Sequence, residues 1–129
     1  MLEAAVVAAD FKDIVDAIRA RLDHAGIALG EAVATLGDSG MLQLVQDMPT
    51  RRVTNALRAG KHAQGQQKWS GSDFIDVVSL PVPTVYCDVV VTEKQWVDLM
   101  KRRKLDERFD TRLISNEKQL IGVLLDATP

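Results

Sequence analysis

The sequence predicts an α/β protein that is rich in helix and carries a small parallel sheet of about two strands. From residue 84 onward the patterns run strand, helix, strand, helix, which is typical of parallel strands joined by a right-handed crossover. The first 65 residues carry only helical patterns. Because two strands are few for a stable sheet, we expect further strands from outside this chain, or a partner chain, to cover the sheet edges.

The N-terminal elements are predicted as helices. Residues 2–25 repeat apolar side chains with the period of an amphipathic helix, and Gly26 ends that helix. Three further helices are expected at residues 28–36, 41–47 and about 50–63. A Gly-Asp-Ser-Gly turn at 37–40 separates the first two, and the third has so modest an apolar face that we predict a surface helix.

The elements predicted after residue 63 are a loop and then short helices that alternate with strands. The polar stretch 64–72 is predicted as a loop, and Ser72 or Asp73 caps a short helix at 73–80 that Pro81 and Pro83 stop. The next elements are a strand at 85–91, a helix at 93–104, a strand at 112–114 and a helix capped by Asn116. The first strand is apolar on both faces, as buried parallel strands are. The helix at 93–104 is expected to bury Trp96, Val97, Leu99 and Met100, and the last helix presents Leu120, Ile121, Val123 and Leu124.

The composition indicates one globular domain over residues 1–129, with a helical part at 1–48 and a second part at 49–126. The hydrophobic content is 47%, with 26% charged residues. Cys87 is the only cysteine, which favours a reducing compartment, and its apolar neighbours predict that it is buried in the strand. Neither a signal peptide nor an apolar run long enough for a membrane span is found, so we expect a cytoplasmic protein without a membrane partner.

Three carboxylates suggest phosphodiester chemistry. Asp73 and Asp76 lie three residues apart, on one face of the short helix. Glu93 follows the apolar strand, at the end where open α/β sheets usually place their ligands. Carboxylate oxygens are the ligands that Mg²⁺ or Mn²⁺ would require. Asp88 lies four residues before Thr92, about 13 Å along a strand, so we assign it a structural role at the strand's start.

The segment from Asp73 to Trp96 resembles the C-terminal half of PIN-like domains, which are metal-dependent nucleases. The matching pieces are Asp-Phe-Ile-Asp at 73–76, Cys-Asp-Val-Val-Val-Thr at 87–92 and Glu-Lys-Gln-Trp at 93–96, and the resemblance covers about residues 48–126. It implies that Asp73, Asp76 and Glu93 are catalytic metal ligands. The family's first strand and its essential Asp have no counterpart here. The resemblance therefore implies a metal-dependent ribonuclease, or the C-terminal part of one with an incomplete active site.

A basic segment lies just upstream of the acids. It contains no Asp or Glu and could contact RNA phosphates, with Trp69 stacking on a base. The nucleic-acid-binding candidates are Arg51, Arg52, Arg58, Lys61, Lys68 and Trp69. A solvated helix explains the charges of this segment equally well. The basic residues Lys101–Lys104 are explained by their place at a helix C-terminus, where positive charge is favourable. Asp73 could also serve only as a helix cap, and Glu93 only as a helix start.

Two other hypotheses compete with the nuclease. The chain could be a non-catalytic α/β module that associates with itself through its sheet edges, or a regulatory α/β domain of unrelated ancestry. A homodimer is expected under all three, because a two-stranded sheet needs cover. Many PIN-like proteins are toxins held by a partner, but the sequence identifies no antitoxin.

Overall fold

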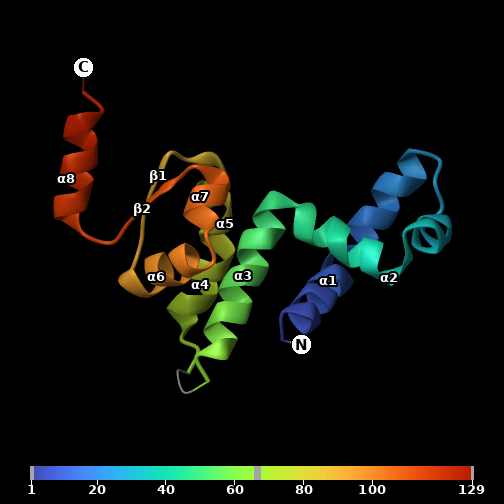
Figure 1. Cartoon of the computed structure of the whole chain (residues 1–129). Coiled ribbons are helices and arrows are strands. Elements are labelled where there is room, and N and C mark those ends of the chain that lie inside the picture. The colour runs from blue at the N-terminus through green and yellow to red at the C-terminus, as the bar shows by residue number, and fades with distance from the viewer. Residues whose placement is uncertain (1, 66–67, 129) are drawn as a thin grey trace.

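The computed structural model describes residues 2–65 and 68–128 as eight helices and one two-stranded parallel sheet (Figure 1). The predicted fold class, helix-rich with a small parallel sheet, is confirmed at this level. The elements are α1 (Leu2–His24), α2 (Leu29–Asp47), α3 (Pro49–Ala63), α4 (Gly71–Ser79), α5 (Pro81–Tyr86), β1 (Val89–Val91), α6 (Lys94–Arg102), α7 (Leu105–Phe109), β2 (Arg112–Ile114) and α8 (Glu117–Asp126).

Helices α1 and α2 pack against each other around a small core. Val7 and Ile14 of α1 meet Val45 of α2 there. Gly26 has a positive φ of 75°, which ends α1 where the sequence predicts. The two helices predicted at 28–36 and 41–47 run together as α2, with a kink at Gly37, whose φ of 67° and ψ of 177° are not helical. A kink thus replaces the predicted turn.

Helix α3 lies at the centre of the molecule, so its prediction as a surface helix is wrong. Figure 1 shows α3 between the α1–α2 pair and the elements from α4 to α7, and it contacts helices on both sides. Val53 and Leu57 are fully buried, and Ala59 is nearly so. Asn55 and Lys61 are buried as well, because acidic side chains of other helices are their partners. Because Asn55 and Lys61 are polar residues on the interior face of α3, the hydrophobic pattern of the sequence does not predict that this helix is buried.

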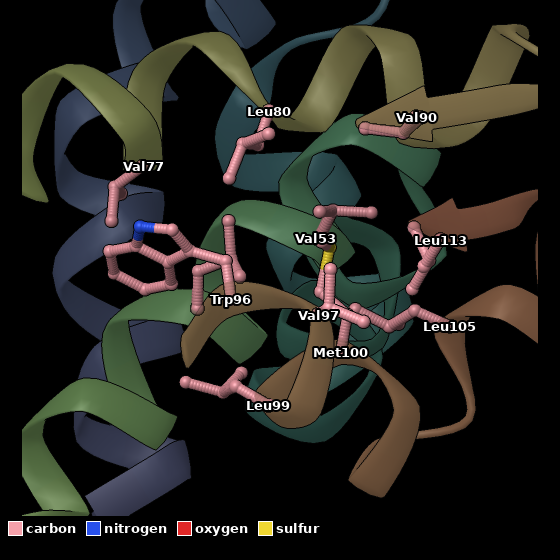
Figure 2. Packing of buried hydrophobic residues seen from close by; sticks show 11 residues of the cluster. Val53, Val77, Leu80, Val90, Trp96, Val97, Leu99, Met100, Leu105 and Leu113 are labelled. Carbon is pink, nitrogen blue, oxygen red and sulfur yellow. The ribbon is translucent and has the colours of Figure 1, made fainter. Parts of the chain in front are cut away.

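The larger core lies between α3, α6 and the sheet. Figure 2 shows this cluster, in which the Trp96 indole lies among aliphatic side chains from several elements. The four residues that the sequence places inside, Trp96, Val97, Leu99 and Met100, are all buried. Gly60 of α3 lies so close to α6 that a Cβ there would be 2.6 Å from Leu99 Cδ1. The two helices therefore meet at a position that leaves no room for a side chain.

The strand predicted at 85–91 is wrong over its first half. Residues 81–86 form helix α5, and only Val89–Val91 form β1. Pro81 occupies the first turn of α5, where proline is favoured because no backbone N–H is needed. Proline therefore starts a helix here as well as stopping one. Cys87 ends α5 and is exposed, which also corrects its prediction as a buried strand residue.

The sheet pairs β1 with β2 in parallel, with Val90 opposite Leu113. Asp88 and Thr111 lie at the end of the sheet where both strands begin. The Asp88 carbonyl accepts from Arg112 N at 2.8 Å, and Thr111 Oγ1 donates to the Cys87 carbonyl at 2.7 Å. Asp88 thus makes a main-chain bond at the strand's start, where the sequence predicts a structural role.

Helix α8 projects away from the rest of the chain (Figure 1). Asn116 caps it as predicted, since its side chain accepts from Gln119 N at 2.9 Å. None of its described residues is buried. Its expected apolar face is therefore uncovered: Leu120 and Val123 are half-buried, and Ile121 and Leu124 are exposed.

Candidate functional site

The N-terminus of α4 holds Asp73 in a fixed place. Ser70 is the N-cap, and its side chain accepts from Asp73 N at 3.2 Å. In return, Ser70 N donates to Asp73 Oδ2 at 2.8 Å, which completes a capping box. The cap is therefore Ser70, two residues before the predicted Ser72, and Asp73 is the third residue of the helix. Asp73 is buried, with 4% of its surface exposed.

Lys61 at the C-terminal end of α3 is the cationic partner of Asp73. Its Nζ lies 3.2 Å from Asp73 Oδ2, and both side chains are almost completely buried. The ammonium group also lies 5.7 Å from the centre of the Trp96 ring. The pKa of Asp73 is lowered from its ordinary value of 3.8, first by the Ser70 backbone bond and further by Lys61, against the opposing effect of burial. Asp73 is therefore held as a carboxylate.

Gln95 connects the two acids that belong to different elements. Its Nε2 lies 3.3 Å from Asp73 Oδ1 and 3.0 Å from Glu93 Oε2, and its Oε1 accepts from Lys61 Nζ at 3.3 Å. We call Lys61, Asp73, Glu93 and Gln95 the acidic cluster. Glu93 is the N-cap residue of α6 and is exposed. The sequence reasoning missed Gln95, although its position two residues after Glu93 is a signal that it could reach the same end of the strand.

Asp76 lies next to this cluster but has another partner. Its Oδ2 accepts from Trp96 Nε1 at 2.8 Å, so the carboxylate serves the only polar group of a buried indole. A buried indole N–H usually needs such an acceptor, which gives Asp76 a structural reason to be where it is. The structure thus joins Asp73 to Glu93 through Gln95, whereas Asp76 is held by Trp96.

The three predicted metal ligands have different neighbours in the structure. Asp73 and Glu93 meet at Gln95, and Asp76 accepts from Trp96. Carboxylate oxygens are the right donors for Mg²⁺ or Mn²⁺. In residues 2–65 and 68–128, no group of three His, Cys, Asp or Glu side chains is arranged to hold a metal ion. The ammonium of Lys61 already neutralises Asp73.

The predicted nucleic-acid-binding residues differ in their burial and in their partners. Arg51 pairs with the buried Asp10 at 2.9 Å, and Arg52 donates to the Gln46 carbonyl at 2.9 Å. Lys61 is buried, Arg58 is half-buried and Lys68 is exposed. Trp69 is half-buried and stacks on Phe74 with ring centres 4.9 Å apart. Of the six candidates, only Lys68 and Trp69 lie in the segment that leads directly into α4.

No family model matches the sequence, and no curated protein and no solved structure matches it. Within the described part of the chain, no helix combines the length and the apolar character that crossing a membrane requires.

Proposed function

We propose that this chain carries part of a PIN-like, metal-dependent ribonuclease site that a second polypeptide segment completes. The observation that supports the proposal is the convergence of Asp73 and Glu93, from two different elements, on the side-chain amide of Gln95. Glu93 follows the carboxyl end of β1, where open α/β sheets bind their ligands, and Gln95 connects Asp73 to it. We place this activity in the cytoplasm, because an exposed lone thiol suits a reducing compartment.

Glu93 and Gln95 of the cluster, and Asp76 beside it, have roles in this proposal. Glu93 is exposed and supplies carboxylate oxygens to Mg²⁺ or Mn²⁺, while Gln95 fixes the distance between Glu93 and Asp73. Asp76, held by Trp96, would supply a further carboxylate. A bound ion would activate water and stabilise the leaving oxygen of an RNA phosphodiester. Lys68 and Trp69, in the segment just before α4, would contact the RNA strand.

Titration of Mn²⁺ by calorimetry tests this proposal. Glu93→Gln is the informative variant, because Glu93 is exposed and its loss leaves the Trp96 contact of Asp76 intact. An incomplete site should bind Mn²⁺ weakly, with a dissociation constant on the order of 10⁻³ M, comparable to the weakest protein calcium sites. We expect the substitution to abolish that binding.

Glu117→Gln is the matched control, since Glu117 is also an exposed acid at the start of a helix. It should leave Mn²⁺ binding unchanged. If the wild type shows no binding, or if all three proteins bind alike, the nuclease proposal is rejected.

A second candidate function is that of a non-catalytic module that associates with itself. The observation that favours it is the uncovered apolar surface of α8, whose described residues are all outside the core. The ion pair between Lys61 and Asp73 also favours it, because a carboxylate neutralised within the chain has less need of a metal. Sedimentation velocity decides this candidate: a monomer at concentrations up to about 100 μM, well above the micromolar range of ordinary interfaces, would exclude it.

A further inference from the structure

A cavity lies where α1, α2 and α3 meet the connection between α6 and α7. Its volume is about 620 Å³, within the range of roughly 300–1,000 Å³ that is typical of small-molecule sites. Its apolar wall comes from Val7, Ala56, Ala59 and Leu105. Glu93 and Gln95 lie at the other end of α6, about 13 Å away by the rise of the nine-residue helix. No residue of the acidic cluster lines the cavity, which is therefore a different site.

The polar lining of this cavity is mainly basic. Four cationic side chains line it, those of Arg52, Arg103, Lys104 and Arg108, together with two acids, Glu3 and Glu107. Arg52 also pairs with Asp47, which lies outside the lining, at 3.5 Å. The chain as a whole has a net charge of −2. The positive charge is thus local, and it favours an anionic ligand.

The local fold places these basic side chains around the cavity. Lys104 has a positive φ of 55°, which ends α6 and turns the chain into α7. Arg108 N donates to the Lys104 carbonyl at 3.1 Å, so the two residues lie one helical turn apart on the same side. Across the cavity, Arg52 Nε donates to the Gln46 carbonyl at 2.9 Å, which orients its guanidinium group. Arg103 is paired with Glu3 of α1.

Asn55 adds a polar group to the same wall. Its Nδ2 donates to Asp10 Oδ2 at 3.2 Å, and since a carboxylate can only accept, this bond fixes which way the amide points. The Oδ1 of Asn55 is buried and has no hydrogen-bond partner among the described residues. A buried acceptor without a donor costs free energy of folding. A ligand that brings a donor group to this wall would remove that cost.

We propose that this cavity binds a phosphate-bearing small molecule of nucleotide size. The four basic side chains meet the phosphate oxygens, and arginine can do so with two parallel hydrogen bonds. The apolar wall and Asn55 contact the part of the ligand that carries no phosphate. Glu3 competes with the phosphate for Arg103, so binding separates that ion pair.

Calorimetric titration of ADP and of inorganic pyrophosphate into the full chain tests the proposal. The pocket variant is Lys104→Asn with Arg108→Gln, in which asparagine keeps the left-handed backbone of position 104 accessible. The matched control is Lys101→Gln with Arg102→Gln, which removes the same charge from the same helix end outside the cavity. We expect ADP to bind the wild type and the control alike within twofold, and the pocket variant at least tenfold more weakly.

Two further measurements complete the test. Glu3→Gln should tighten ADP binding severalfold, because it removes the competitor of the phosphate. Pyrophosphate that binds as tightly as ADP would mean that only the phosphates are recognised, and weaker pyrophosphate binding would assign a role to the apolar wall. Absence of ADP binding at millimolar concentration, or equal losses in the two double variants, would overturn the proposal. If the pocket variant does not fold, Arg108→Gln against Arg102→Gln makes the same comparison.

Discussion

At the scale of single residues, hydropathy alone does not predict which polar side chains are buried, because their burial depends on their partners. The burial of Trp96 could be predicted, because an indole in an amphipathic helix belongs to the core. The burial of Lys61 could not, because lysine is almost never buried unless it is paired, and its partner Asp73 comes from a different helix. The acids of the site could be proposed from the sequence. The spacing of Gln95 from Glu93 indicates that it can reach that acid, but its contact with Asp73 depends on how α4 and α6 pack.

The lowered pKa of Asp73 predicts a dependence of stability on pH. Because the folded state favours the ionised carboxylate, its contribution to stability is present above the ordinary value of 3.8 and is lost as the pH falls through the lower pKa of the folded state. Asp73→Asn should therefore show a smaller loss of stability between pH 7 and pH 3 than the wild type. Urea unfolding at a series of pH values measures this difference.

The control for this experiment is Asp16→Asn. Asp16 is paired with Arg19 on the surface of α1, where such pairs contribute little. Its pH profile should stay close to that of the wild type. Parallel profiles for the Asp73→Asn variant and the wild type would show that the Asp73 carboxylate does not stabilise the fold.

At the scale of elements, a helix or strand is predicted well where its own sequence carries a long periodic pattern. Helix α1 has a long periodic stripe and was predicted almost to the residue. Helix α5 was missed because Val85 and its neighbours suit a buried strand, while Pro81 at the start of the first turn favours a helix. The single apolar run therefore divides into a short helix and the three-residue strand β1.

The contact between α3 and α6 yields a prediction about Gly60. A Cβ at this position would lie within 3 Å of three atoms of the buried Leu99 side chain. Alanine favours helix over glycine by about 1 kcal/mol, but overpacking a core costs about 1–3 kcal/mol. We expect Gly60→Ala to lower the free energy of unfolding by up to about 2 kcal/mol, as measured by urea denaturation.

Gly122→Ala provides the comparison. A Cβ at Gly122 in α8 would meet nothing within 4 Å. That substitution should not destabilise the chain and should raise its helix content. Equal effects of the two alanines would mean that α3 and α6 do not approach each other as closely as described.

At the scale of the whole molecule, apolar side chains of the described residues are uncovered on two groups of helices, among other places. One such surface is on α4 and α5, where Phe74, Ile75, Val78, Val82 and Tyr86 are exposed, and another is on α8, where Ile121, Leu124 and Leu125 are exposed. Apolar surface grouped in this way marks interaction sites in soluble proteins. The expectation from sequence that the small sheet needs a partner stays a prediction, because both surfaces lie on helices and not on the sheet edges.

Self-association therefore has a direct test in α8. Leu124→Glu with Leu125→Glu replaces two exposed side chains, so the monomer should keep its stability. If copies associate through α8, light scattering after size-exclusion chromatography will show a dimer for the wild type and a monomer for the variant. Thr128→Glu, an exposed position beyond α8, adds charge without removing apolar surface and should leave the dimer intact. A wild type that is monomeric, or a variant that is still dimeric, would contradict the role of α8.

The exposed thiol of Cys87 offers a practical consequence. Cys87 is the only cysteine of the chain, and it lies between α5 and β1, close to the first of these apolar surfaces. A nitroxide label can therefore be attached at one known position of the unmodified sequence. In a symmetric dimer, two such labels give a single distance by pulsed electron paramagnetic resonance, which would locate the dimer axis relative to the sheet.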